Sequence, residues 1–307
     1  MQQDVRPLPR VSVVMGVRNG ADSIASTIGS LTSQQGVDLE VIVVNDGSTD
    51  RTSEILATLA AADAWLWVVN REGRGLTASL IEGCRIARGD FIARQDAGDW
   101  SLPGRLQRQA ACLIAHPEAS LCSSHVRYVV AEGATVRVNA PDPATLADGL
   151  TGPASHGSVM MRRSSYLAAG GYRPAFYYAQ DIDLWSRMVE IGDHLVLPEV
   201  LYEAGVSPES ISGSRRQEQE TFHSFIVGAT RARRSGSSEE AWLEQAAAFS
   251  QKCRQPARNP GREAAGAYFI GASLAAHQPE LARRYLHRAL QLNPWHLKAR
   301  LKLARLR

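Results

Sequence analysis

Residues 39–56 read LEVIVVNDGSTDRTSEIL, and this stretch decides the fold. Apart from Glu40, its first six residues are apolar and mostly β-branched, which is typical of a strand covered on both faces. The polar turn Asn45–Asp50 follows, and Thr49 or Asp50 is expected to cap a helix that runs to about Ala61. A buried strand that passes through a tight polar turn into a helix is the repeating unit of a parallel α/β sheet.

The flanking sequence repeats this unit. We expect further strands and helices, in alternation, at residues 11–17 (VSVVMGV), 21–34, 65–69, 76–87 and 90–93. Polar clusters follow the strands at Arg18–Asn19, Asn45–Asp50 and Gln95–Asp99. The carboxyl ends of parallel strands meet at one edge of a sheet, where ligands bind in such folds. The sequence therefore predicts a polar ligand site at that edge.

The pattern changes after about residue 120. We expect a hairpin around Glu132-Gly133, a strand at 157–161, a helix at 181–191 and one or two short strands at 195–201. After Ser214 only helical patterns remain. We therefore expect two regions, an α/β domain at residues 1–213 and a helical region at residues 214–307.

Three short motifs each allow a chemical and a structural interpretation. GRGLTA (73–78) resembles a dinucleotide-binding loop, although such loops normally open the first strand–helix unit. Asp96 and Asp99 suit a divalent cation, or Asp99 instead caps a helix from about residue 102. The carboxylate of Asp181 is favoured by the dipole at the start of its helix, and it is either a simple cap or a functional group.

Taken in order along the chain, these segments resemble a family 2 glycosyltransferase with a GT-A fold. The resemblance rests on NDGSTD between a strand and a helix, on DAGD some 50 residues later, and on QDIDLWSRM. It covers about residues 11–212 and implies a Rossmann-like mixed α/β sheet flanked by helices, while the helical patterns after Ser214 add an all-α C-terminal region. It also implies inverting transfer of a sugar from a nucleotide-sugar donor.

The resemblance implies roles for individual residues. The positions that match the family's nucleotide-binding loops are Val17, Arg18, Asn19, Asp46, Arg71, Gly75 and Asp96. Ser48 and Asp50 belong to the same loop, where turn and cap roles are an equally good interpretation. Asp181 matches the general base, which takes a proton from the acceptor hydroxyl. Asp96 and Asp99 match the carboxylates at a divalent cation, Mg²⁺ or Mn²⁺, that offsets the charge of the leaving diphosphate.

Further residues are expected around the donor and acceptor, namely Ala97, Gly98, His156, Gln180 and Trp185. A structural role explains His156 equally well. Trp185 lies at helical spacing with Ile182 and Met188, which favours a place in the core over stacking on a sugar.

The sequence departs from the family pattern in three places. Gly98 stands where the family motif DADD often supplies a metal ligand. Gly205 and Ser207 stand where the family often has Arg and His, and Gln180 replaces the Glu before the base. These losses keep open a second interpretation, a catalytically degenerate GT-A domain that binds a nucleotide or glycan, or serves as a scaffold.

The composition limits the alternatives. Of 307 residues, 44% are hydrophobic and 21% are charged, which excludes an intrinsically disordered chain. The net charge is +3, yet residues 281–307 carry eight basic and no acidic side chains, which leaves −5 for the rest. We therefore expect no nucleic-acid partner. Near the C-terminus, Leu297, Leu301 and Leu303 alternate with Lys and Arg, as in a basic helix on an anionic membrane or one with a solvated face.

The remaining expectations concern partners and location. The expected donor is a UDP-, GDP- or dTDP-sugar, and the expected acceptor is a glycan or a lipid-linked saccharide. Ala282, Ala289, Asn293 and Pro294 weakly resemble the second helix of a tetratricopeptide repeat. The sequence shows no secretory leader and no membrane span. Four unpaired cysteines are typical of a reducing compartment, so we expect a cytoplasmic protein, with peripheral attachment at the inner face of the membrane as an alternative.

Overall fold

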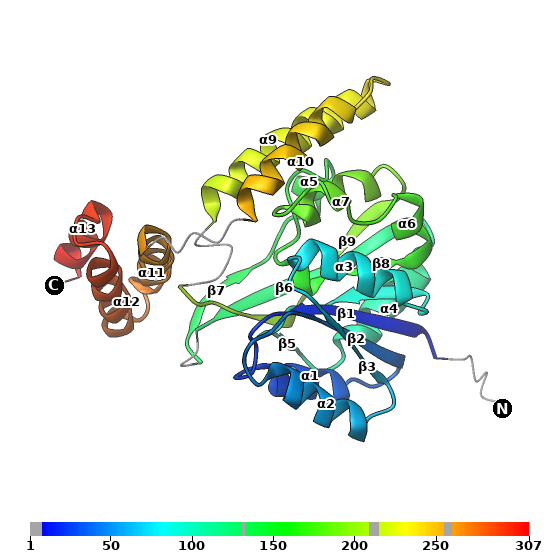
Figure 1. The fold of residues 1–307 in the computed structure, drawn as a ribbon, viewed down its shortest axis with the longest axis horizontal. Coiled ribbons are helices and arrows are strands. Elements are labelled where there is room, and N and C mark those ends of the chain that lie inside the picture. Colours follow the sequence, from blue (N-terminus) through cyan, green and yellow to red (C-terminus); the bar gives the residue numbers. More distant parts are fainter. Residues whose placement is uncertain (1–7, 131–132, 209–214, 255–259, 307) are drawn as a thin grey trace.

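A computed structural model describes residues 8–130, 133–208, 215–254 and 260–306. Its centre is one nine-stranded sheet with helices on both faces (Figure 1). Along the sheet the order is β3 (Leu66–Arg71), β2 (Asp38–Asp46), β1 (Arg10–Val17), β4 (Phe91–Arg94), β8 (Met160–Arg162), β6 (Ala119–Val129), β9 (Asp193–Gly205) and β5 (Trp100–Ser101). The ninth strand, β7 (Thr135–Asn139), pairs with β6.

The first half of the sheet is the parallel unit that the sequence predicts. Strands β3, β2, β1 and β4 are parallel, and α1 (Ile24–Thr32), α2 (Thr52–Ala62) and α3 (Leu76–Ile86) connect them. Helix α2 begins slightly later than expected, but the Asp50 carboxylate still accepts a hydrogen bond from the Thr52 amide (3.0 Å). The NDGSTD turn therefore leads from a buried strand into a helix, as predicted, but the residue at the N-cap is Arg51 and not Thr49 or Asp50.

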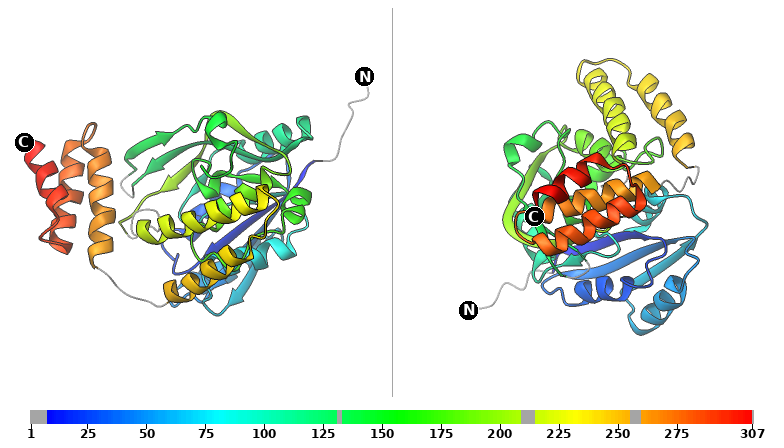
Figure 2. Two further views of the ribbon diagram at one scale, coloured as in Figure 1. Left: turned by 90° about the horizontal axis from the view of Figure 1, so that it is seen from above. Right: turned by 90° about the vertical axis from the view of Figure 1, so that its left-hand side faces the viewer.

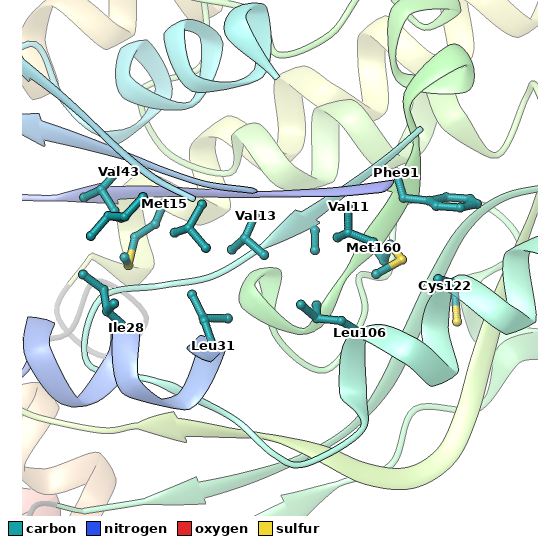
Figure 3. Packing of buried hydrophobic residues seen from close by; sticks show 14 of the residues in the cluster. Val11, Val13, Met15, Ile28, Leu31, Val43, Phe91, Leu106, Cys122 and Met160 are labelled. Carbon is teal, nitrogen blue, oxygen red and sulfur yellow. The ribbon is translucent and has the colours of Figure 1, made fainter. Parts of the chain in front are cut away.

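Alternate residues of β1 enter two hydrophobic cores on opposite faces of the sheet. Val11 and Val13 lie on the face covered by α1 and by α4 (Arg105–Ala115), where they are fully buried (Figure 3). Val14 lies on the other face, in a cluster with residues of α3 and of α7 (Gln180–Met188). Because helices cover both faces, this strand needs an almost continuous apolar sequence, and VSVVMGV provides it.

The second half of the sheet brings in antiparallel pairs and corrects three predictions. The strand expected from residue 157 begins only at Met160, after a 3₁₀ turn, η1 (His156–Ser158). The short strands expected at 195–201 are part of the single strand β9. The helix expected from about residue 102 is α4, which begins at Arg105, because β5 pairs with β9 and Gly104 adopts a left-handed conformation (φ 77°).

Helices account for all of the described chain after residue 214, apart from the links between them. These helices are α9 (Arg216–Arg234), α10 (Glu240–Cys253), α11 (Pro260–Leu274), α12 (Pro279–Leu292) and α13 (Leu297–Arg305). Two short helices, α5 (Pro143–Leu146) and α6 (Arg163–Ala168), belong to the α/β part instead. Figure 2 shows α9 and α10 as one antiparallel pair and α11–α13 as a second group at the end of the molecule.

The C-terminal helices share hydrophobic clusters with the α/β part. Phe222 of α9 is fully buried among aromatic residues that include Phe176 and Tyr178. Ile270 of α11 packs with Val136 of the β6–β7 hairpin. The proposed division at residue 213 falls within 209–214, outside the described residues, and the packing joins both sides of it into one structure.

Three further points concern these helices: the packing of α11 against α12, the tetratricopeptide likeness and the question of a membrane span. A Cβ added to Gly271 of α11 would lie 2.8 Å from a side-chain carbon of Leu286, so a glycine permits the close approach of α11 and α12. The tetratricopeptide likeness itself is not confirmed and stays a prediction. Among the described residues, no helix combines the length and apolar character that crossing a membrane requires.

Replacing Phe222 with Ala tests whether α9 and α10 belong to the same cooperative unit as the sheet. The cavity left by a fully buried phenylalanine costs about 3–5 kcal/mol of unfolding free energy. Urea unfolding followed by helical ellipticity and by tryptophan fluorescence should show one coincident transition at lower urea. The control Ile114→Ala, at a side chain 53% exposed on α4, should change stability by no more than about 0.5 kcal/mol. Equal stability of the two variants would contradict this packing.

Candidate active site

A cavity of about 1290 Å³ opens at the carboxyl edge of the parallel strands. Most of the predicted site residues line it, namely Val17, Arg18, Asp46, Gly75, Asp96, Ala97, Asp99, His156, Gln180, Asp181 and Trp185. These residues are spread over 169 positions of sequence, and the ends of β1, β2 and β4 and the start of α7 bring them together. The edge predicted from the strand pattern is therefore the edge that carries the cavity.

Asp46 anchors the loop that precedes α3. One carboxylate oxygen accepts the Arg74 amide (2.7 Å) and the other accepts the Gly75 amide (2.8 Å). Gly75 has φ 93°, and a Cβ there would lie 2.5 Å from the ring of Tyr177. The GRGLTA amides thus bind a protein carboxylate, so they do not form the pyrophosphate cradle that a dinucleotide loop would require.

Three predicted residues take other positions. Asn19 (φ 54°) turns its side-chain oxygen toward the β2–α2 loop, where it accepts the Thr49 amide (2.8 Å). Arg71 forms an ion pair with Glu82 of α3. The amide of Gly98 donates to the Thr27 hydroxyl (3.0 Å) of α1. None of the three is among the described residues that line the cavity, and their roles toward nucleotide or substrate stay predictions.

Arg94, which the sequence analysis overlooked, positions Asp96. Its guanidinium is fully buried and donates to the Asp96 carboxylate and to the carbonyl oxygens of Val14 and Gln95. The Asp96 amide donates to the hydroxyl of Tyr202 (3.0 Å) on β9. The Asp96 side chain remains 32% exposed, toward the cavity. A charged residue at the end of an otherwise apolar strand, next to a carboxylate motif, was the available signal.

The departures at Gly98 and Gly205 meet in space. The Gly205 amide donates to Asp99 (2.8 Å), and a Cβ at Gly205 would lie 2.8 Å from the Gly98 carbonyl oxygen. Asp99 is 7% exposed; its burial, and next the charge of Asp96, raise the pKa of its carboxyl well above the ordinary value. The alternative role of Asp99, a cap for the next helix, is wrong, since β5 intervenes before α4.

The carboxylates of Asp96 and Asp99 fit a divalent cation that takes only one or two of its ligands from the protein. Among the described residues there is no cluster of three or more His, Cys, Asp or Glu side chains that could form a complete metal cage. Mg²⁺ and similar ions take one or two carboxylates and complete their shell with phosphate oxygens and water. Asp96 and Asp99 both face the cavity and provide such a pair. A cation between them would also favour the ionised form of Asp99.

Asp181 lies in the first turn of α7, in the wall of the same cavity. The residue before the helix, Ala179, adopts a left-handed conformation (φ 57°), which turns the chain into α7 at this point. One carboxylate oxygen of Asp181 accepts the amide of Ile182 (2.9 Å). Burial raises the pKa of Asp181 to about 6, with a smaller contribution from the negative charge of Asp96. The structure thus contains a carboxyl group suited to proton transfer near neutral pH.

His156 and Trp185 form a packed part of the wall. Nε2 of His156 accepts from Arg94 (3.3 Å) and lies 2.7 Å from the hydroxyl of Tyr172. Burial, and next the charge of Arg94, lower the pKa of His156 well below its ordinary value, so the ring is neutral. Trp185 is 3% exposed and packs edge-on against His156. It is a core residue, as its helical spacing indicated, although one edge borders the cavity.

The far wall of the cavity comes from the C-terminal helices. Tyr268 and Phe269 of α11 line it, as do His296 and Lys298 at the start of α13. The rings of Tyr268 and His296 stack with centroids 4.9 Å apart. This wall was not predicted from the sequence, because helical patterns do not reveal which strands a helix will face.

Comparison with known proteins places the chain in a family. The sequence model of Glycosyl transferase family 2 matches residues 12–170, just over half of the chain. The chain therefore belongs to this glycosyltransferase family, and the resemblance inferred from its motifs is confirmed. One relative is the putative glycosyltransferase EpsE of Bacillus subtilis, 37% identical over 191 residues, which are 60% of this chain and 68% of EpsE.

Solved structures agree with this fold. The mannosyltransferase PcManGT from Pyrobaculum calidifontis, in complex with GDP-Man and Mn²⁺, superposes with a TM-score of 0.59 at 20% identity, covering 98% of this chain and 90% of that one. Residues 1–349 of S. aureus TarS, in complex with UDP-GlcNAc, give 0.55 at 14% identity, with 97% and 79% covered. The mixed sheet with its flanking helices is thus the predicted GT-A fold.

Replacing Asp46 with Ala should release the loop before α3 and weaken nucleotide binding about tenfold, since two amide hydrogen bonds hold that loop beside the cavity. Calorimetric titration with UDP and GDP in the presence of Mn²⁺ measures the effect. Asp50→Ala is the matched control, because Asp50 lies four positions after Asp46 but its carboxylate binds Thr52 and the Ala21 amide and not the loop before α3. Unchanged affinity in the Asp46 variant would contradict this role.

Proposed function

We propose that this glycosyltransferase moves a sugar, with inversion, from a nucleotide-sugar donor to a hydroxyl of a glycan or lipid-linked saccharide. The observation that carries the proposal is the position of Asp181, a carboxyl with a raised pKa in the same cavity as Asp96 and Asp99. A base on one side and a cation site on the other are the two groups that a single displacement requires.

The donor is expected to lie along the ends of the parallel strands. Support comes from the walls at Val17, Arg18 and Asp46, which follow β1 and β2, and from PcManGT and TarS, whose structures hold GDP-Man and UDP-GlcNAc. Arg18 is exposed at this edge and provides a positive charge for the diphosphate. UDP-, GDP- and dTDP-sugars all remain candidates, and the proposal commits to the nucleotide-sugar class.

In the proposed reaction, Asp181 takes the proton of the acceptor hydroxyl. The oxygen of that hydroxyl bonds to the anomeric carbon while the bond from that carbon to the diphosphate breaks. The electron pair of the broken bond leaves with the nucleoside diphosphate, so one displacement inverts the configuration. Ionised Asp181 predominates at neutral pH with a pKa of about 6, and it is still basic enough to accept the proton.

Asp96 and Asp99 are the residues that would hold the divalent cation, Mg²⁺ or Mn²⁺. When bound, such an ion offsets the charge that develops on the leaving diphosphate. Arg94 supports this arrangement by fixing one oxygen of Asp96 and leaving the other side of the carboxylate toward the cavity. The departure at Gly98 therefore removes one ligand that the family often has, while the pair that remains faces the same cavity.

The acceptor is expected between Asp181 and the C-terminal wall. Tyr268 and Phe269 provide aromatic faces there, and aromatic rings commonly pack against the apolar faces of sugars. We therefore place the acceptor saccharide beside α11, with its reacting hydroxyl toward Asp181. The proposed location is the cytoplasm, at the inner face of the membrane, where a lipid-linked acceptor would lie.

Replacing Asp181 with Asn should leave donor binding intact and reduce turnover by about 10²–10⁴-fold, because the amide cannot accept the proton. Release of UDP or GDP from nucleotide sugars, with and without Mn²⁺, measures turnover, and a thermal-shift series identifies the donor that the wild-type protein binds. Asp183→Asn is unsuitable as a control, because Asp183 pairs with Arg187 in the core. Asp193→Asn makes the same exchange at an exposed residue of β9 that is not among the described residues lining the cavity, and it should leave turnover unchanged. Full turnover in the Asp181 variant would contradict the assignment.

The pH dependence provides a second readout on the same residue. A raised pKa means that Asp181 gains its proton, and loses its function as a base, as the pH falls through about 6. Wild-type kcat should therefore drop tenfold per pH unit below that value, while the residual rate of Asp181→Asn lacks this step. Release of UDP or GDP that Mn²⁺ stimulates would also exclude the second interpretation, a degenerate binding module. Such a module would bind a nucleotide sugar without cleaving it.

A further inference from the structure

Three large apolar side chains are exposed side by side near the end of the described chain. Trp295 is 81% exposed, Leu297 72% and Leu301 61%. The other large apolar residues that are exposed in the described structure lie singly on different elements, for example Trp67 on β3 and Ile114 on α4. Isolated exposed apolar residues are ordinary, whereas a group within seven positions asks for an explanation.

The helix geometry places the two leucines of this group on the outer side of α13. Leu297 and Leu301 are four residues apart and share one face. Ala299 lies on the opposite face, fully buried in a cluster with Leu286 and Ala289 of α12. In Figures 1 and 2, α13 lies at the outer end of the α11–α13 group, with α11 between it and the sheet. The inner face of α13 is therefore packed, and its outer face is not.

The same face is strongly basic. Lys298, Arg300 and Arg305 are exposed around the leucines, and Arg288 is exposed on α12. The guanidinium of Arg300 lies 5.7 Å from the centre of the Trp295 ring and donates to the Pro294 carbonyl oxygen (2.6 Å). From Leu281 onward the sequence contains no Asp or Glu to neutralise these charges.

We propose that Trp295, Leu297, Leu301, Arg300 and Arg305 form a docking face for an anionic lipid bilayer. Leucine side chains enter the boundary between headgroups and acyl chains, and tryptophan favours the same depth. Each Lys or Arg near an anionic surface adds to the attraction, which falls within a Debye length. A stable protein interface buries about 800 Å² on each partner, and three apolar side chains are too few to form its apolar centre.

The docking face is continuous with the cavity. His296 and Lys298 alternate in sequence with Trp295 and Leu297, and both line the cavity wall beside Tyr268. A bilayer against α13 therefore lies next to the proposed acceptor side of the site. This step rests on the proposed function, and it names the acceptor class as a saccharide carried on a membrane lipid.

Sedimentation of the full chain with vesicles tests the docking face without any donor or acceptor. The protein should bind vesicles of phosphatidylcholine with a quarter phosphatidylglycerol, and binding should weaken in about 0.5 M NaCl, where charges are screened within a few ångströms. Vesicles of phosphatidylcholine alone should bind at least about tenfold more weakly, because only the apolar contribution remains.

Two variants separate the contributions. Leu297→Ser with Leu301→Ser removes the apolar contacts, and Arg300→Gln with Arg305→Gln removes two charges; each pair should lower affinity for anionic vesicles about tenfold. Ile114→Ser with Leu167→Ser is the matched control, since these side chains are 53% and 55% exposed on other elements. Circular dichroism and thermal unfolding verify that every variant is folded, and release of UDP or GDP from the donor follows activity separately.

Failure to bind anionic vesicles, or equal binding by the leucine variant, would overturn the docking face while leaving the transferase assignment untouched. Sedimentation velocity supplies a further outcome. A dimer that Leu297→Ser with Leu301→Ser dissociates would assign the face to a second copy of the chain and would also overturn the proposal.

Discussion

The guanidinium of Arg94, buried at the end of β4, joins three parts of the chain that form the site. It donates to the backbone of β1 at Val14, to the Asp96 carboxylate and to His156. A buried charge costs several kcal/mol unless it is paired and hydrogen-bonded, so these partners have to stay in place around it. Arg94 thereby determines where Asp96 lies, and Asp96 in turn is the carboxylate that the donor and its cation would meet.

A second buried guanidinium supports the first from behind. Arg105, at the start of α4, donates to the Arg94 carbonyl oxygen (2.6 Å) and to the side chain of Gln95 (3.0 Å), and lies over the ring of Tyr202. The turn between β4 and β5 is thus held by side chains from a helix and from a distant strand. The rigidity of the Asp96–Asp99 turn follows from packing that spans more than a hundred residues.

Much of the fold, and the edge of the sheet that carries the cavity, were predictable because they depend on local patterns. The run VSVVMGV and the turn NDGSTD specify a buried strand and a helix whatever surrounds them. The antiparallel half of the sheet was harder to predict from the sequence. Strand β5 is stabilised by pairing with β9 and the start of β8 by pairing with β4, and not by their own two or three residues. The positions of Asn19 and Arg71 escaped prediction because a motif identifies a loop but not the direction of each side chain.

The role of the C-terminal helices escaped prediction for a different reason. Their apolar faces predict helices, but the partner that each face covers is a property of the folded chain. Phe222 covers the segment that leads into α7, and α11 covers the β6–β7 hairpin beside the cavity. His296 and Lys298, at the start of α13, also line the cavity, so the region that carries the excess positive charge contributes to the wall of the candidate site.

In the proposed reaction, a single displacement takes place at the anomeric carbon, and Asp181 is the one base. Proton NMR of the sugar released from an α-linked donor, UDP-GlcNAc or GDP-mannose, measures the configuration before the free sugar equilibrates. With water in place of the acceptor, a single displacement should release the β-anomer first. Initial release of the α-anomer would contradict it, because retention requires a second displacement and a nucleophile that the proposed mechanism does not contain.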